Sequence, residues 1–106
     1  MQYFVVFTPK KRFEVVGTPD DFPKLLPQEE ARAKELYGEG TLRQSWVLGK
    51  RDKGAACLFE AASPEALQVI IDSFPLIQKG YSDYEIYSLA PDPVFAKPSW
   101  IKSMLA

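Results

Sequence analysis

Two apolar segments joined by a short turn occupy residues 41–61, whose sequence is TLRQSWVLGKRDKGAACLFEA. The large apolar residues in both segments indicate β-strands at 41–50 and 55–61. The residues between them, 51–54, end on a glycine and predict a turn. We therefore expect a β-hairpin whose second strand is apolar on both of its faces.

The segments on either side of this hairpin add two further strands. Residues 2–8, QYFVVFT, are aromatic and β-branched, and residues 83–90, DYEIYSLA, show a similar composition. Residues 9–24 contain prolines, a glycine and a basic run, which predict a long connection. Prolines punctuate the chain after residue 90, so we expect an extended tail with one or two amphipathic turns at 99–105.

Two helices are expected between the strands. Pro27 suits the first turn of a helix, which we expect to run to about Tyr37 and to end at the glycines that follow. The sequence Ser63-Pro64-Glu65 predicts the N-cap and first turn of a second helix, which Pro75 ends. Residues spaced for buried stripes are Leu26, Ala33, Leu36 and Tyr37 in the first helix and Leu67, Ile70, Ile71 and Phe74 in the second.

The resulting element order, strand-helix-strand-strand-helix-strand, predicts an α+β fold of the ferredoxin-like class with a four-stranded antiparallel sheet. Two helices can cover only one face of such a sheet. Because strands 2–8 and 55–61 are apolar on both faces, we expect a second copy of the chain to cover the other face in a homodimer. We assign residues 1–90 to this domain and residues 91–106 to a tail that packs on the partner subunit.

The composition fits a single small domain and excludes several kinds of partner. The chain has 106 residues, of which 46% are hydrophobic, and its formal net charge of −1 offers no field to recruit nucleic acid or anionic membranes. No apolar stretch approaches the roughly 20 residues of a membrane span. The N-terminus has no basic region before its apolar run, so we expect no signal peptide and a cytoplasmic protein.

Among the features of the composition, the absence of histidine restricts the possible catalytic chemistry most. The chain has no His and a single cysteine, Cys57, which excludes histidine-dependent triads, the usual zinc sites and an intrachain disulfide. No phosphate-binding glycine loop and no cluster of metal-ligating acids is recognisable. Catalysis without a cofactor or metal would therefore rely on carboxylates, tyrosines, lysines, arginines or hydroxyl groups acting on a small-molecule substrate.

The stretch 39–49, EGTLRQSWVLG, resembles the Gly-Thr-x-Arg-x-x-Trp-x-x-Gly pattern of the muconolactone isomerase family. Residues 58–60, 74–77 and 84–86 also resemble the family at matching positions. The resemblance implies a dimeric α/β barrel, which agrees with the dimer expected from the strand patterns, and it allows assembly into higher homo-oligomers. It also implies a cofactor-free site between the sheet and the helices that isomerises or dehalogenates small lactones in aromatic degradation.

The resemblance assigns roles to particular residues. An acid near the start of the first helix aligns with Glu29, with Glu30 adjacent, and the family's strand arginine and tryptophan align with Arg43 and Trp46. The chain departs from the family at Phe4, where the family has a histidine, and after Trp46, where the family has a second arginine. The proline-rich tail also lacks the family's histidine and serine residues.

The residues themselves support these roles and leave alternatives open. Glu29 lies at the edge of an apolar stripe, where burial would raise its pKa and suit it to general acid–base catalysis; its other reading is a favourable interaction with the helix dipole. Arg43, among apolar neighbours, could bind a substrate carboxylate or form a salt bridge with Glu60. Trp46, which regular alternation places on the face of Leu42, could stack on a planar ligand or belong to the core.

Several tyrosines are further candidates. Tyr3 and Tyr37, like Tyr84 and Tyr87, could donate a hydrogen bond to a substrate oxygen, and no spacing singles out one of them. Cys57, in an apolar strand, is expected to be a buried small hydrophobe. The function predicted is a cofactor-free isomerase of small lactones or related carbonyl compounds. The alternatives are a cofactor-independent monooxygenase or cyclase on the same fold, and a non-catalytic module for small-molecule binding or oligomerisation.

Overall fold

The computed structural model describes residues 1–50 and 53–96. Its elements alternate in the predicted order, with three short helices added. The strands are β1 (Gln2–Pro9), β2 (Leu42–Val47), β3 (Ala55–Glu60) and β4 (Ser82–Leu89), and the helices are α1 (Phe13–Val16), α2 (Phe22–Gly38), α3 (Pro64–Asp72), α4 (Pro75–Gln78) and α5 (Pro93–Ala96).

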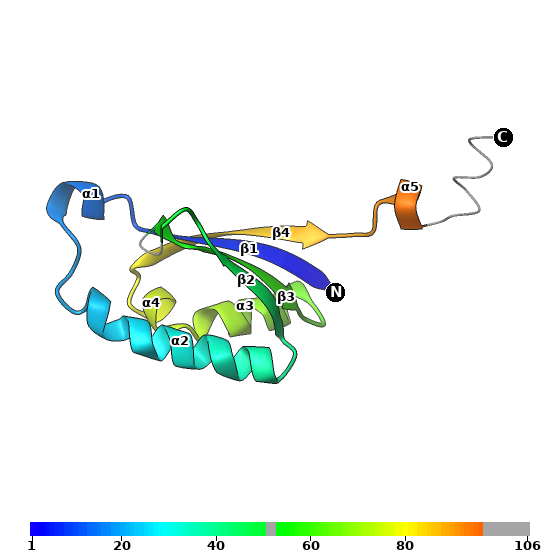
Figure 1. Cartoon of the computed structure of the whole chain (residues 1–106), viewed down its shortest axis with the longest axis horizontal. Coiled ribbons are helices and arrows are strands. Elements are labelled where there is room, and N and C mark those ends of the chain that lie inside the picture. The colour runs from blue at the N-terminus through cyan, green and yellow to red at the C-terminus, as the bar shows by residue number, and fades with distance from the viewer. Residues whose placement is uncertain (51–52, 97–106) are drawn as a thin grey trace.

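The four strands form one antiparallel sheet in the order β2-β3-β1-β4. Helices α2, α3 and α4 lie on the same side of this sheet (Figure 1). The α+β ferredoxin-like prediction is therefore confirmed. As the sequence pattern also predicted, no helix within residues 1–50 and 53–96 covers the other face of the sheet (Figure 1).

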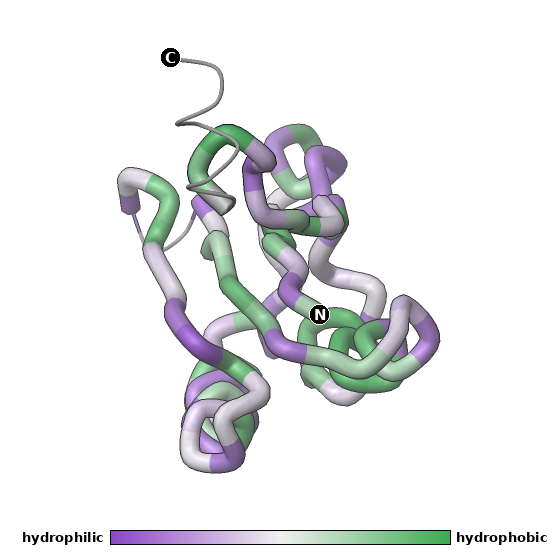
Figure 2. The backbone as a smooth tube through the Cα atoms, turned by 90° about the vertical axis from the view of Figure 1, so that its right-hand side faces the viewer, coloured by the Kyte–Doolittle hydropathy of each residue, from purple (hydrophilic) through white to green (hydrophobic). Residues whose placement is uncertain are grey.

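The core lies between the sheet and the helices. Tyr3 and Val5 of β1 and Phe59 of β3 are buried on the helix side of the sheet. They pack in one cluster with Leu36 of α2, Leu67 and Ile71 of α3, and Phe74, which precedes α4. Figure 2 shows hydrophobic stretches in both the strands and the helices that pack on them. Burial of apolar surface between these two layers is the main term that stabilises the fold.

Helix α3 begins and packs as its sequence predicts. The side-chain oxygen of Ser63 accepts a hydrogen bond from the main-chain N–H of Ala66 at 3.1 Å, which confirms Ser63 as the N-cap. Leu67 and Ile71 are fully buried. The helix ends before Pro75, and the chain then forms the short helix α4, which the sequence analysis did not predict.

Helix α2 begins earlier than expected, at Phe22 instead of Pro27. Pro23 occupies the first turn, where the N–H that proline lacks has no partner within the helix. Leu25, in this first part of the helix, is buried. Pro27 is therefore inside the helix, which tolerates the loss of one hydrogen bond. Tyr37 was wrongly placed in the buried stripe: it is 64% exposed, because Leu36 occupies the inward position and the next residue lies about 100° around the helix.

A β-bulge changes which residues of β2 face the helices. Leu42 pairs with Phe59, whereas Gln44 pairs with Leu58, so Arg43 is an extra residue in the ladder. Leu42 and Ser45 consequently lie on the same side of the sheet, and Trp46 lies on the other. Regular alternation predicted Leu42 and Trp46 on one face, and this prediction was wrong.

The face of the sheet away from the helices carries large apolar side chains. Phe4 and Trp46 pack against each other there, with ring centroids 6.0 Å apart. Leu89 and Tyr87 of β4 are also exposed. After β4 the chain extends away from the domain through α5 (Figure 1). The amphipathic turns expected at 99–105 lie outside the described residues.

Candidate active site

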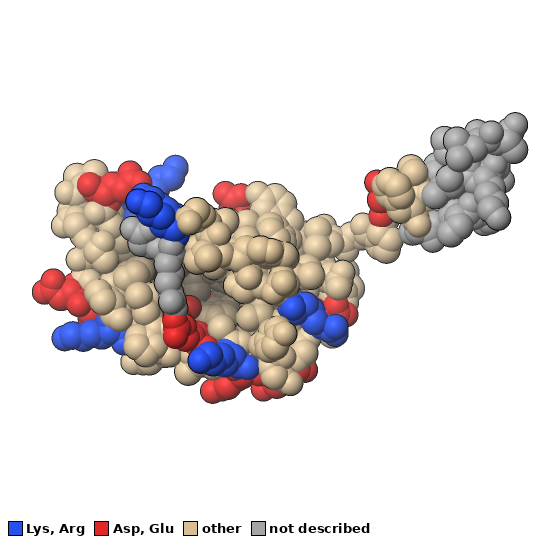
Figure 3. Space-filling model, in the orientation of Figure 1, with Lys and Arg blue, Asp and Glu red and all other residues tan. Residues whose placement is uncertain are grey.

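A cavity of about 1060 Å³ lies between α2 and the helix side of the sheet. Most of its wall is apolar, with aromatic and aliphatic side chains that include Phe7, Phe22, Leu26, Val47, Phe74 and Leu76. Figure 3 shows the surface hollowed between the sheet and the helices, with charged side chains of both signs around the hollow. A mostly apolar cavity with a few polar groups is the usual form of a site for a small organic molecule.

Glu29 is an acidic side chain of this cavity that a main-chain hydrogen bond holds in place. Its Oε1 accepts a hydrogen bond from the main-chain N–H of Leu76, with a nitrogen–oxygen distance of 2.5 Å. Leu76 follows Pro75 at the start of α4, where main-chain N–H groups have no partner within the helix. The carboxylate is thus anchored by a segment 47 residues along the chain.

The helical repeat explains why Glu29 faces inward. It lies three residues after Leu26 and four before Ala33, and both of these line the cavity as well. The side chain is half-buried. Burial raises the pKa of the Glu29 carboxyl above its ordinary value, and the hydrogen bond from Leu76 lowers it by a smaller amount. A carboxyl group with a raised pKa can both accept and return a proton.

Ser45 and Cys57 form a polar pair on the sheet wall of the same cavity. They are opposite one another in the β2–β3 ladder, and Ser45 Oγ lies 3.5 Å from Cys57 Sγ. Burial raises the pKa of the Cys57 thiol, the hydrogen bond with Ser45 opposes this, and the negative charge of Glu29 raises it further. The charge of Glu29 therefore acts on the Cys57 thiol across the cavity.

The sequence analysis treated these two residues differently. Cys57 is buried, as expected, but it also borders the cavity. Ser45 was not among the predicted site residues. A serine in an apolar hairpin is a weak signal, and only the bulge at Arg43 shows that it faces inward.

The other predicted site residues lie at different places. Glu30 borders the cavity with its side chain exposed. Trp46 also borders it, but its ring packs on Phe4 at the opposite face of the sheet. Tyr3 is buried in the core and Tyr37 is exposed, and neither lines the cavity.

Arg43 lies in the bulge, outside the cavity wall. It is exposed, and its Nε donates a hydrogen bond to the main-chain oxygen of Gly40 at 2.5 Å. Glu60, the alternative partner suggested by the sequence, forms its ion pair with the N-terminal amino group at 3.1 Å. The structure thus does not bring Arg43 together with Glu29.

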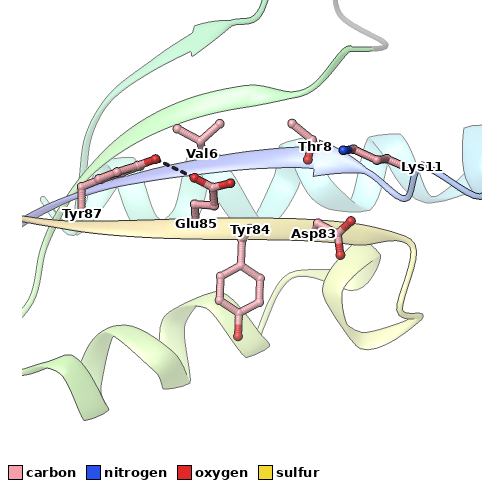
Figure 4. A pocket seen from close by; sticks show the side chains of 7 residues that line it. All are labelled: Val6, Thr8, Lys11, Asp83, Tyr84, Glu85 and Tyr87. Atoms are coloured by element: carbon pink, nitrogen blue, oxygen red, sulfur yellow. Dashed lines mark hydrogen bonds between the residues drawn. The ribbon is translucent and has the colours of Figure 1, made fainter.

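A second, smaller hollow of about 500 Å³ lies on the face of the sheet away from the helices. Figure 4 shows Val6, Glu85 and Tyr87 on that face, with Tyr84 pointing to the opposite side. The hydroxyl of Tyr87 donates a hydrogen bond to Glu85 at 2.5 Å. This bond raises the pKa of the Tyr87 hydroxyl.

The described residues contain neither a candidate metal site nor a candidate membrane span. Within residues 1–50 and 53–96, no group of three or more His, Cys, Asp or Glu side chains is placed to hold a metal ion. In the same part of the chain, no helix is long and apolar enough to cross a membrane.

Comparison with known proteins assigns the chain to a family. The family model for muconolactone delta-isomerase matches residues 1–94. The chain belongs to the muconolactone delta-isomerase family. The match confirms the resemblance seen around residues 39–49, and it covers the elements that build the cavity.

Two solved structures share the fold of this chain, and one of them is a muconolactone isomerase. A muconolactone isomerase is 30% identical to this family member, with a TM-score of 0.61 over 88% of this chain and 92% of the other. A 5-chloro-2-hydroxyhydroquinone dehydrochlorinase from Burkholderia phenoliruptrix AC1100, in complex with 2,5-dihydroxybenzoquinone, has a TM-score of 0.65 over 87% of this chain and 96% of the other. At 12% identity, this second likeness shows the shared fold alone. No curated protein sequence matches the chain.

Proposed function

We propose that this protein is a cofactor-free isomerase of small lactones or related carbonyl compounds, with Glu29 as the group that transfers the proton. The observation that carries the proposal is the Glu29 carboxyl itself: half-buried, anchored by Leu76 and raised in pKa at the wall of a mostly apolar cavity. Family membership and the named muconolactone isomerase support an isomerase or related catalytic function.

The geometry suggests how the carboxyl would act. With Oε1 held by the N–H of Leu76, Oε2 takes a proton from the carbon next to the carbonyl of the lactone. The electron pair of the broken C–H bond moves into the ring to form an enolate. The protonated Glu29 then returns the proton to another carbon, which shifts the double bond and restores the carboxylate. No atom or electron is gained or lost overall.

The half-buried carboxyl in the cavity favours an isomerase over a protein that only binds small molecules. A site that only bound apolar molecules would not need a half-buried carboxyl, because burying an ionisable group disfavours its charged form. Glu29 faces the cavity instead of open solvent. A cofactor-independent monooxygenase or cyclase on the same fold is the second enzyme class to test, since its reaction depends on a reactive substrate more than on particular residues.

The complete site is proposed to belong to a homodimer. The apolar face that includes Phe4, Trp46 and Leu89 is the surface on which a second copy would pack, sheet to sheet. We propose that residues 91–106 then pack on the partner subunit and that the dimer can assemble further. A cytoplasmic location and a role in aromatic degradation remain parts of the same proposal.

The test is a survey of substrates with the purified protein. Enol lactones of different ring substitution are incubated with the protein, and movement of the double bond is followed by proton NMR. We expect isomerisation of at least one of them without added metal or cofactor. The Glu35→Gln variant serves as a control on the same helix, because Glu35 is exposed and paired with Arg32, and it should retain full activity. Absence of turnover across the lactones, with dioxygen-dependent conversion of a related substrate, would favour the monooxygenase class.

A further inference from the structure

We propose that Ser45 is a catalytic residue whose hydroxyl donates a hydrogen bond to the substrate oxygen that becomes negatively charged when Glu29 removes the proton. The inference rests on the proposed function and adds a group that neither the sequence analysis nor the comparisons assign. It depends on three observations: the direction in which β2 presents Ser45, the partner of its hydroxyl, and the position of Glu29 across the cavity.

The bulge at Arg43 is what turns Ser45 toward the cavity. Without the extra residue, Ser45 would lie on the face opposite to Leu42. With it, Ser45 shares the helix side with Leu42 and pairs with Cys57. This side of β2 faces α2, which carries Glu29. A short hydroxyl side chain there leaves space for a substrate between the sheet and the helix.

The hydroxyl of Ser45 has a partner that it can exchange at little cost. Its neighbour within the structure is Cys57 Sγ at 3.5 Å, where either group can be the donor, and a thiol is both a weak donor and a weak acceptor. The thiol keeps its own proton at neutral pH, because burial and the charge of Glu29 both raise its pKa. Rotation of the Ser45 hydroxyl toward a substrate oxygen would therefore replace a weak hydrogen bond with a stronger one to a developing anion.

The cavity also carries the hydroxyl groups of Thr8, Thr18 and Ser82. Ser82 donates to the main-chain oxygen of Thr8 at 3.2 Å. Val5 of β1 pairs with Cys57, and Thr8 lies three residues further along the same strand. Thr8 is therefore about 10 Å from Val5 along β1. Cys57 is the residue on which the charge of Glu29 acts. Ser45, which pairs with Cys57, is consequently a hydroxyl of the wall on which the charge of Glu29 acts.

The chemical need for such a donor follows from the reaction. When Glu29 takes the proton from the carbon next to the carbonyl, the electron pair places negative charge on the carbonyl oxygen. A negative charge in an apolar cavity is costly unless a hydrogen-bond donor faces it. Removal of one donor of this kind from an enzyme typically lowers kcat by about 10²–10³-fold.

The experiment compares Ser45→Ala and Ser45→Thr with the wild type on a lactone that the wild type isomerises. We expect Ser45→Ala to lower kcat by about 10²-fold with little change in KM, and Ser45→Thr, which keeps the hydroxyl, to recover most of the activity. Ser88→Ala is the matched control, because Ser88 lies in β4 and lines neither cavity.

The outcomes separate this inference from the proposed function. If Glu29→Gln abolishes turnover while Ser45→Ala keeps kcat within twofold of the wild type, the role of Ser45 is wrong and the proposed function stands. Equal losses in Ser45→Ala and Ser45→Thr, with a lowered thermal midpoint in both, would also contradict a role for the hydroxyl. A wild type that isomerises no lactone overturns the proposed function and the role of Ser45 with it.

Discussion

The main-chain N–H of Leu76 donates a hydrogen bond to Oε1 of Glu29 across 2.5 Å, and this contact joins the start of α4 to the middle of α2. It fixes the orientation of a half-buried side chain that could otherwise adopt several rotamers. Burial raises the pKa of Glu29 more than this bond lowers it. The balance leaves the group able to take and return a proton at the cavity wall.

The raised pKa of Glu29 predicts how stability depends on pH. Because the carboxyl is more basic in the folded than in the unfolded state, folding favours its protonated form. Its contribution is present below the unfolded pKa and is lost as the pH rises through the folded pKa. The free energy of unfolding of the wild type should therefore fall relative to that of Glu29→Gln as the pH is raised from about 3 to about 8. Denaturant unfolding at a series of pH values measures this difference, and a difference independent of pH would contradict the assigned burial.

Arg43 provides a test of the cavity boundary. Since it lies in the bulge and donates to Gly40, outside the cavity wall, we expect Arg43→Met to change KM by less than about twofold. Steady-state kinetics on an isomerised lactone measures this effect. A KM raised tenfold or more would instead support the substrate-binding role that the family resemblance implies.

The core predicts a clear contrast between two residues of α3. Ile71 is fully buried, whereas Val69, two residues earlier, is 71% exposed. We expect Ile71→Ala to lower the free energy of unfolding by about 2–5 kcal/mol, because it removes buried apolar surface and leaves a cavity. Val69→Ala should change it by less than about 0.5 kcal/mol. Similar effects of the two substitutions would contradict the orientation of α3.

The uncovered face of the sheet predicts an effect on assembly. Phe4 packs on Trp46 at that face, so a lysine there would place a charge inside the proposed sheet-to-sheet interface. We expect the wild type to be a dimer or a higher assembly by light scattering and Phe4→Lys to shift it toward the monomer. Val69→Lys, on the exposed side of α3, is the matched control and should assemble as the wild type does. A monomeric wild type would overturn the proposed dimer.

Local signals in the sequence were sufficient for most of the fold. Ser63 and Pro64 mark the start of α3 through interactions within one turn, and the residue types of 2–8 are those of a buried strand. The start of α2 was missed because Pro27, a good first-turn residue, lies inside a helix that Pro23 and Leu25 extend. Propensity alone does not rank two prolines that both suit a first turn.

The candidate site was only partly predictable, because it depends on strand register and on contacts between residues distant in the sequence. Glu29 was predicted because the family resemblance aligns an acid with it, and its position beside the apolar stripe of α2 agrees with its place in the cavity wall. The inward direction of Ser45 depends on the register between β2 and β3, which shifts at Arg43 through pairing that no local pattern reveals. The contact between Glu29 and Leu76 joins residues 47 apart and requires a helix, α4, that the sequence did not indicate.

The most direct test of the central claim compares the kcat of Glu29→Gln with that of the wild type on the best lactone substrate. Glutamine keeps the size of the side chain and can still accept the hydrogen bond from Leu76, but it cannot take a proton. We predict a loss of at least about 10²-fold in kcat, with the folded structure unchanged by circular dichroism. A Glu29→Gln variant that isomerises the lactone within about twofold of the wild-type rate would contradict the assignment of Glu29 as the catalytic group.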